Sequence, residues 1–322
     1  MAIRTTLTEA FGMEYPIVLA PMNGIAGGRL AAAVSNAGGL GLVGGGYGDP
    51  EWLQRELALV QAETDRPWGV GLITWHASRA VVDLALSSHP DVFLLSFGEA
   101  RRYASRIKAA GCTLLCQVQG VEMARAAVVA GADVIVAQGS EAGGHGAAGH
   151  ATFPLVPAVV DAVAPVPVLA AGGIADGRGL AAALMLGAEG AMLGTRFAAA
   201  TESLMPEPAK ARLLTAHAAD TVRTRVFDLI RAYPWPEPYT GRAVRNDFCT
   251  RWHGREGELV AALETELPAY QRAVAEGDFE TAVIFAGEVV ELIDAIEPAA
   301  ELVRRIGAEA EAQLRRGAAL LA

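Results

Sequence analysis

The stretch of sequence that decides the fold runs from Val134 to Gly146 and reads Val-Ile-Val-Ala-Gln-Gly-Ser-Glu-Ala-Gly-Gly-His-Gly. Its first four residues are apolar, which is typical of a strand buried on both faces. The residues that follow are mainly small, so a planar ligand can lie close to the backbone. His145 is the one side chain in this loop that can exchange a proton near neutral pH. A strand followed by a flexible small-residue loop with one titratable group predicts an active site at a strand end.

Similar apolar runs alternate with Ala- and Leu-rich stretches on both sides of this segment. Strands that are apolar on both faces and separated by amphipathic helices indicate a parallel sheet. The predicted strands are 17–20, 40–43, 69–72, 92–96, 113–117, 134–137, 168–171 and 190–193. The predicted helices include 28–37, 51–63, 78–87, 100–110, 121–130 and 178–186. Eight such units over roughly 200 residues predict an α/β fold, a closed (β/α)8 TIM barrel, with an open doubly wound sheet as the alternative.

After Arg196 this alternation stops. Residues 198–278 show no clear strand pattern and contain several prolines and aromatic residues, which predicts a mostly helical insertion over the top of the barrel. The chain then continues with 279–293 and ends in an amphipathic stretch, 299–321, and one of the two is expected to supply the eighth barrel helix. The predicted domains are therefore a barrel (1–200), a helical substrate or lid domain (201–280) and C-terminal helices that complete the barrel (281–322).

The composition of the chain limits the classes of protein to which it can belong. Of the 322 residues, 52% are hydrophobic and 19% are charged, which allows a sizeable core. A net charge of −10 without a long Lys/Arg cluster argues against nucleic acids and anionic membranes as partners. The N-terminus has no apolar signal core, and no apolar stretch reaches bilayer length. Three cysteines form no disulfide or zinc pattern, so we predict a soluble, cytoplasmic protein.

The ends of the last two predicted strands indicate a phosphate site. Strand seven runs into Ala171-Gly172-Gly173, and strand eight runs into Gly194-Thr195. In barrel enzymes the loops after strands seven and eight form the common phosphate site. Backbone N–H groups in these two loops are expected to bind the phosphate. The alternative is that Gly172 and Gly173 only form a tight turn.

Other patterns in the sequence have simpler explanations. Residues 39–44 match GxGxxG, but the glycines run into and through a predicted strand, so we interpret them as a tight helix-to-strand turn and not as a dinucleotide fingerprint. A metal site built from Glu141, His145 and His150 would lie in a loop too rich in glycine to hold ligands rigidly, and no metal is predicted. For His145 itself the alternative is a hydrogen-bonded structural histidine. Ser140 has no adjacent base, so a serine nucleophile is not expected.

Several motifs, taken in order, resemble the nitronate monooxygenases, formerly called 2-nitropropane dioxygenases. The matching segments are PIVLAPM (16–22), AVSNAGGLG (33–41), QGSEAGGH (138–145), AAGGIADG (170–177) and LGAEGAMLGTRF (186–197). The resemblance covers about the first 200 residues well and continues more weakly to 277–278 and 286–287. It implies an FMN-dependent barrel with a helical substrate domain.

The resemblance also implies roles for individual residues. His145 aligns with the catalytic histidine of the family. FMN would lie on the first strand end, with Gln117 near the pyrimidine edge of the flavin, two glycines facing the ring, and the phosphate in the last two loops. The residues implied for FMN are Pro21, Met22, Asn23, Gln117, Gly143, Gly144, Ala171, Gly172, Gly173, Gly194 and Thr195.

The implied activity is oxidation of an alkyl nitronate, or of its parent nitroalkane, by dioxygen to a carbonyl compound and nitrite. His145 would bind the nitro oxygens if protonated, or abstract the α-proton if neutral. Met22, Tyr233, Trp235 and Tyr239 are expected to line an apolar pocket. A homodimer is a possible assembly.

Two alternative functions stay open. The same superfamily includes NAD(P)H-dependent flavin reductases of quinones and enoyl thioesters, although those more often carry Gln-Gly-Gly-Met where this chain has Leu-Ala-Pro-Met. A flavin-binding or ligand-sensing module without turnover is disfavoured by the presence of His145. Glu288 stands where many relatives have glutamine, and it would repel an anionic nitronate if it faced the pocket.

Overall fold

Eight parallel strands form the centre of the protein, whose computed structural model describes residues 3–321. The sheet order is β1-β9-β8-β6-β5-β4-β3-β2, so each strand lies beside its neighbours along the chain. The strands are β1 (Ile17–Leu19), β2 (Gly41–Gly46), β3 (Trp68–Ile73), β4 (Val92–Ser96), β5 (Thr113–Val118), β6 (Val134–Gln138), β8 (Val168–Ala171) and β9 (Gly190–Leu193). The eight strands predicted from the sequence are confirmed.

The two ends of this sheet meet and nearly close it. Val18 in β1 forms a parallel bridge with Leu40 at the start of β2. The N–H of Leu19 donates to the carbonyl of Leu40, and the N–H of Leu40 donates to the carbonyl of Ile17, both at 2.9 Å. The fold is therefore a (β/α)8 TIM barrel, and the open doubly wound sheet is wrong.

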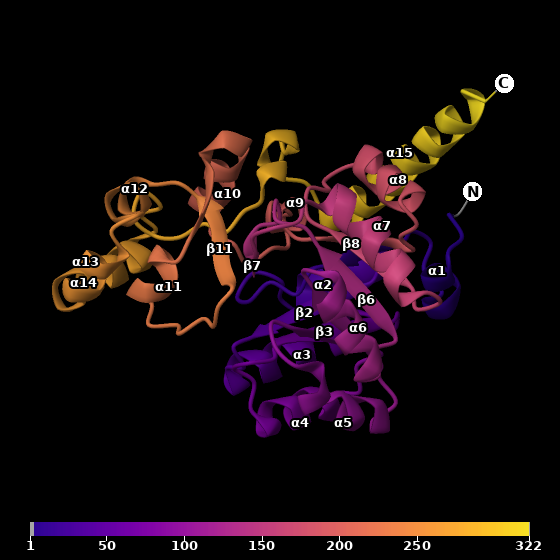
Figure 1. The fold of residues 1–322 in the computed structure, drawn as a ribbon, viewed down its shortest axis with the longest axis horizontal. Helices are drawn as coiled ribbons and strands as arrows, with labels where there is room; N and C mark the ends of the chain where they lie inside the picture. The colour runs from indigo at the N-terminus through magenta and orange to yellow at the C-terminus, as the bar shows by residue number, and fades with distance from the viewer. Residues whose placement is uncertain (1–2, 322) are drawn as a thin grey trace.

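Helices cover the outside of the barrel (Figure 1). Those between the strands are α2 (Gly28–Asn36), α3 (Pro50–Glu63), α4 (Arg79–Ser87), η1 (Ala100–Arg102), α5 (Ala104–Ala109), α6 (Val121–Val129), α7 (Thr152–Val163) and α8 (Gly177–Met185). One buried apolar cluster lies between strands and helices. A second, with Leu42, Leu94 and Val136, fills the barrel interior. Leu7 of α1 (Thr6–Phe11) joins this second cluster, so α1 packs against the interior.

The eighth barrel helix is α15 (Ala299–Ala319), which lies beside α8 in Figure 1 and also packs against α2. Of the two candidate segments, 299–321 therefore supplies this helix. The other, 279–293, contains only the short turn η3 (Glu288–Leu292). No helix within residues 3–321 has the length and apolar character needed to cross a bilayer.

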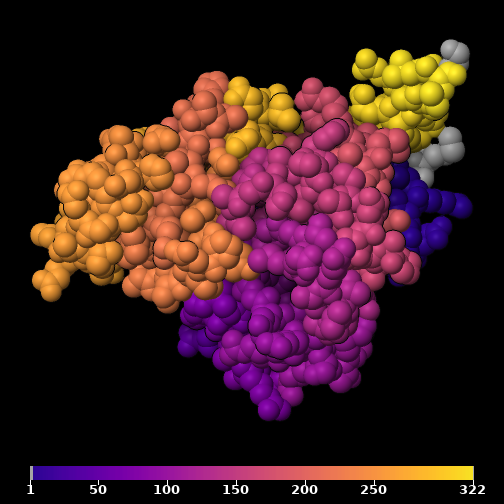
Figure 2. All heavy atoms as spheres, viewed as in Figure 1, coloured from indigo at the N-terminus to yellow at the C-terminus, as the bar shows by residue number. Residues whose placement is uncertain are grey.

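A smaller lobe lies beside the barrel, formed mainly by the residues after α9 (Thr195–Ala198) and coloured orange in Figures 1 and 2. It contains helices and also two strands, although the sequence shows no clear strand pattern in this region. Its elements are α10 (Glu207–Leu214), η2 (Ala218–Asp220), β10 (Thr221–Thr224), α11 (Val226–Ile230), β11 (Tyr239–Val244), α12 (Asp247–Trp252), α13 (Glu256–Ala261) and α14 (Leu263–Glu276).

These two strands pair with a third strand from the barrel side. The sheet order is β10-β11-β7, all antiparallel, and β7 (Gly144–Ala147) contains His145. The expectation of a flexible loop around His145 is therefore wrong. Gly-His-Gly-Ala has little intrinsic β-propensity, so its extended backbone depends on hydrogen bonds to β11, which lies almost 100 residues further along the chain.

The packing of α15 predicts opposite effects for two glycines in one helix. A Cβ at the buried Gly307 would lie 2.0 Å from Cδ1 of Tyr15, whereas a Cβ at the exposed Gly317 meets nothing within 4 Å. Gly307→Ala should lower the free energy of unfolding by about 1–3 kcal/mol through overpacking. Gly317→Ala should raise it by up to about 1 kcal/mol, because alanine restricts the unfolded chain. Urea unfolding of both variants checks this, and equal effects would contradict the packing.

Candidate active site

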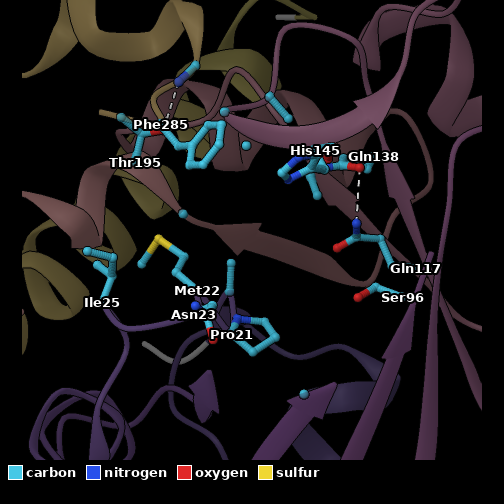
Figure 3. A pocket seen from close by; sticks show the side chains of 18 of the residues that line it. Pro21, Met22, Asn23, Ile25, Ser96, Gln117, Gln138, His145, Thr195 and Phe285 are labelled. Atoms are coloured by element: carbon cyan, nitrogen blue, oxygen red, sulfur yellow. Dashed lines mark hydrogen bonds between the residues drawn. The ribbon is translucent and has the colours of Figure 1, made fainter. Parts of the chain in front are cut away.

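A cavity at the C-terminal ends of the barrel strands contains the predicted site. It has a volume of about 230 Å³, against roughly 10–15 Å³ for one water molecule, so it can take a sizeable ligand. His145 and all the residues implied for FMN line it (Figure 3). The smaller lobe adds Arg231 and Trp235, and the C-terminal segment adds Phe285 and Gly287.

The turn after β1 is placed against glycines of the neighbouring strands. A Cβ at Gly44 would lie 2.1 Å from the carbonyl oxygen of Met22, and a Cβ at Gly71 would lie 2.2 Å from Cγ of Pro21. Only glycine permits this approach. Gly41 and Gly44 lie within β2, so the GxGxxG match serves packing, which agrees with its interpretation as a structural motif.

The loops after β8 and β9 offer free backbone donors to the cavity. Gly172 and Gly173 have φ values of +100° and +71°, which side chains disfavour. Among the described residues, the N–H groups of Gly173 and Thr195 have no hydrogen-bond partner. Oγ1 of Thr195 accepts the N–H of Gly287 at 3.0 Å, which leaves its hydroxyl proton free to donate (Figure 3). Neutral donors of this kind suit an anion such as a phosphate.

A glycine is required at position 143 because the C-terminal segment crosses the chain there. The N–H of Glu288 donates to the carbonyl of Glu141 at 3.0 Å, which brings the C-terminal segment against the His145 region. A Cβ at Gly143 would lie 2.5 Å from the backbone nitrogen of Gly287. The missing Cβ of Gly143 therefore faces this segment. Gly144, with a φ of +68°, has no atom within 4 Å of an added Cβ.

Glu288 does not line the cavity. Its Oε1 forms an ion pair with Nη2 of Arg242 at 3.0 Å. The repulsion of an anionic substrate that the sequence suggested therefore does not arise. Tyr233 and Tyr239 do not line the cavity either, whereas Trp235 and Met22 do. Tyr233 instead stacks on Tyr47, with ring centroids 4.0 Å apart.

A chain of glutamines joins β5 to β7. Nε2 of Gln117 donates to Oε1 of Gln138 at 3.0 Å, and Nε2 of Gln138 donates to the carbonyl of His145 at 3.1 Å (Figure 3). Gln119 donates to the same Gln138 oxygen at 2.8 Å. Oε1 of Gln117 has no partner among the described residues and remains available to a ligand. Gln138, which no sequence motif marks as functional, thus positions both Gln117 and His145.

Asp228 in α11 holds the imidazole of His145. Nε2 of His145 lies 2.9 and 3.0 Å from the two carboxylate oxygens of Asp228, and both side chains are buried. The imidazole ring stacks on Trp235, with ring centroids 3.6 Å apart and an interplanar angle of 6°. Nε1 of Trp235 donates to the hydroxyl of Tyr47 at 2.8 Å. Burial raises the pKa of Tyr47 to about 12, so this hydroxyl stays neutral.

The environment of His145 favours its neutral form. Burial lowers its pKa below the ordinary value, and the positive charges of Arg231 and Arg223 act in the same direction. The hydrogen bond and the charge of Asp228 oppose this shift without cancelling it. Because a carboxylate can only accept, Nε2 carries the ring proton and Nδ1 does not. Nδ1 has no partner among the described residues and is not shut off from solvent, so it is open to the cavity.

Sequence reasoning missed Asp228 and Arg231. They are separated from His145 by more than 80 residues, and their segment carries no motif. Two of the three side chains weighed and rejected as metal ligands have other partners, because Glu141 accepts the N–H of Thr152 at 2.9 Å while His145 bonds Asp228. Within residues 3–321, no group of three or more His, Cys, Asp or Glu side chains could hold a metal ion.

Comparison with known proteins shows the family of this chain. The family model described as nitronate monooxygenase matches residues 4–82 and 74–309. The chain belongs to the nitronate monooxygenase family. It is 36% identical to the nitronate monooxygenase of Neurospora crassa, over 93% of this chain and 90% of that protein. As a member of this family it is an oxidoreductase.

Other relatives of this nitronate monooxygenase family member carry different names. It is 32% identical, over the whole of both chains, to the (3aS,4S,5R,7aS)-5-hydroxy-7a-methyl-1-oxo-octahydro-1H-indene-4-carboxyl-CoA dehydrogenase of Mycobacterium tuberculosis. Among solved structures, FabK from Thermotoga maritima matches with a TM-score of 0.88 and 33% identity, over 99% of this chain and 100% of that one. Nitroalkane oxidase from Streptomyces ansochromogenes matches with a TM-score of 0.80 and 31% identity, over 97% and 99%.

Replacing Asp228 should move the pKa of His145 in a defined direction. The carboxylate raises this pKa, so Asp228→Asn should lower it further below that of the wild type. Asp228→Glu keeps the charge and is the matched control, with a smaller change expected. An NMR titration of the His145 ring measures the shift. A raised or unchanged pKa in Asp228→Asn would show that the carboxylate does not act on the imidazole.

Proposed function

We propose that this chain is an FMN-dependent oxidoreductase that converts nitroalkanes and their nitronates to carbonyl compounds and nitrite with dioxygen. The observation that carries the proposal is the protonation state and hydrogen bonding of His145. Its buried imidazole is held through Nε2 by Asp228, while Nδ1 is unprotonated and open to the cavity. A positioned neutral histidine is suited to remove a proton from a carbon acid.

The residues of the cavity fit FMN. The free N–H groups of Gly173 and Thr195 can take its phosphate without a lysine or arginine, and Oε1 of Gln117 can accept from the pyrimidine edge. The glycines in β2 pack against neighbouring segments of the chain, so they do not form a dinucleotide-binding loop for an adenosine moiety. FMN is therefore favoured over FAD. When bound, FMN supplies the electron acceptor and the site of reaction with dioxygen.

For a neutral nitroalkane, Nδ1 of His145 takes the α-proton. The imidazolium then formed is stabilised by the hydrogen bond that it donates to Asp228. The rings of Trp235, Phe97 and Phe285 lie around the imidazole and exclude water, and their apolar surfaces suit an alkyl group. A nitronate arrives already deprotonated and makes no demand on the base.

A second candidate is a flavin-dependent oxidoreductase of acyl thioesters. It is favoured by the relative from Mycobacterium tuberculosis, which is named as a carboxyl-CoA dehydrogenase and matches over the whole of both chains. The same histidine could take the proton of a hydroxyl group, or serve the NAD(P)H-dependent reduction of an enoyl thioester or a quinone. The two candidates differ in what reduces the flavin.

An anaerobic reduction screen separates these candidates. Nitroalkanes and propionate 3-nitronate are expected to bleach the flavin absorbance, and NADH and NADPH are not. Readmitting dioxygen should restore the absorbance with release of nitrite. Rapid bleaching by NADH or NADPH, with none by any nitro compound, would refute the proposal in favour of the second candidate.

FMN occupancy provides a test that does not require turnover. The purified protein should release about one FMN per chain, as in a one-site cofactor enzyme. A Cβ at Gly194 would meet only Ala20 and Met22 at 3.6 and 3.7 Å, so Gly194→Ala should fold normally and weaken FMN binding by roughly tenfold or more, about 1.4 kcal/mol. Gly257→Ala, where an added Cβ meets nothing within 4 Å, is the control. Full FMN content in both variants would place the phosphate elsewhere.

Gly173 is less suited to this test. Its φ of +71° and the 3.1 Å approach of an added Cβ to Cγ of Glu141 would strain any substitution there. A loss of FMN in such a variant would therefore not separate a blocked phosphate site from a disturbed loop.

Replacing His145 by Asn should affect the two substrates unequally. Loss of a positioned base typically costs about 10²–10⁴-fold, so kcat/KM for a nitroalkane should fall by this much. The fall for the matching nitronate should be smaller. His217→Asn, at an exposed histidine paired with Glu291, is the control. Equal losses on both substrates would show that His145 acts only by binding, and no loss would return it to a structural role.

A further inference from the structure

Arg231 brings a permanent positive charge to the cavity beside His145. Among the described residues that line the cavity, it is the only lysine or arginine. Two other arginines lie close by but are occupied elsewhere. Arg223 donates to the carbonyls of Ser140, Gly146 and Thr240, and Arg242 pairs with Glu288.

The guanidinium of Arg231 is held on one side and free on the other. Nε donates to the carbonyl of Phe227 at 2.8 Å, and Nη2 donates to Oδ1 of Asp228 at 3.1 Å. The rings of Tyr233 and Phe285 lie 5.2 and 5.1 Å from the guanidinium carbon. Nη1 has no partner among the described residues and is not shut off from solvent. A fixed cation whose Nη1 carries two unused N–H donors therefore borders the cavity.

Asp228 connects this cation to the base. His145 and Arg231 bond the same carboxylate oxygen of Asp228, at 2.9 and 3.1 Å. The charges of Arg231 and Asp228 offset each other before substrate binds, so the cluster is neutral while His145 is neutral. A substrate that enters as an anion, or becomes one on losing a proton, gains a positive partner in the same cluster.

We propose that Nη1 of Arg231 is the receptor for the oxygens of the substrate's nitro or nitronate group, while His145 acts only as the base. This inference rests on the proposed function. The sequence left two roles open for His145, binding the nitro oxygens and removing the proton, and here Arg231 takes the first and His145 the second. A guanidinium matches a planar pair of oxygens better than any other cationic side chain. Arg231 serves both substrates, whereas His145 serves only the nitroalkane.

Nitrate, a planar oxyanion that is not oxidised, serves as the probe. Calorimetric titration of the FMN-loaded protein with nitrate should show saturable binding. Arg231→Gln keeps an amide donor for Asp228 but removes the charge, and it should weaken nitrate binding about 10- to 100-fold, the usual size of a charged hydrogen bond. The control is Arg225→Gln, in the same lobe, where the arginine pairs with Glu237 at 3.2 Å and does not line the cavity.

Kinetics with both substrates separate the two residues. Arg231→Gln should lower kcat/KM for the nitroalkane and the nitronate by similar factors of about 10 to 100, unlike His145→Asn. Nitrate should compete with the nitronate in the wild type. FMN content and the unfolding midpoint, measured on each variant, show that the loss is local.

Several outcomes would overturn the assignment. They are the absence of saturable nitrate binding in the wild type, unchanged nitrate affinity in Arg231→Gln, or an unchanged kcat/KM for the nitronate. If Arg231→Gln does not fold, NMR of the wild type replaces it. The ¹⁵N chemical shift of Nε of Arg231 should then change on addition of nitrate, and an unchanged chemical shift would refute the proposal. If the wild type oxidises no nitro compound, the proposed function fails and with it the role of Arg231 toward a nitro substrate, whereas nitrate binding that is lost in Arg231→Gln would show only an anion site.

Discussion

The candidate site depends on the antiparallel pairing of β7 with β11. This pairing places Gly241 opposite His145 and joins a loop of the barrel to the smaller lobe. A Cβ at Gly241 would lie 2.6 Å from the ring of Phe285 and 3.5 Å from Nε2 of His145, so the strand contacts the imidazole closely. Without this pairing, the backbone of the glycine-rich segment would have no fixed direction, and His145 would not reach Asp228.

Close backbone contact forms the rest of the cavity. The turn at Pro21 and Met22 lies against glycines of β2 and β3, and the C-terminal segment crosses at Gly143 and Gly287. Each crossing leaves no room for a Cβ. The loops of a barrel and a second lobe thereby converge on one cavity, with rigid strands beneath them.

The charged side chains beside the cavity form one hydrogen-bonded cluster in which the positive and negative charges balance. Asp228 is the shared acceptor of a histidine and an arginine, and Trp235 covers the imidazole. Burial keeps His145 neutral, while the carboxylate fixes which ring nitrogen carries the proton. A neutral base of this kind beside a cation suits the removal of a proton from a carbon next to a nitro group, which is the first step of the proposed reaction of a nitroalkane.

The sequence by itself determined the barrel and the wall of the cavity that the barrel provides. Buried strands alternate locally with amphipathic helices, and the strand ends carry motifs such as Gly172-Gly173 and Gly194-Thr195, so both can be read from neighbouring residues. Asp228, Arg231 and the strand at His145 could not be predicted, because they follow from contacts between segments more than 80 residues apart. Only the tertiary structure decided which nitrogen of His145 is free and that Glu288 pairs with Arg242 outside the cavity, since both depend on partners that no local pattern specifies.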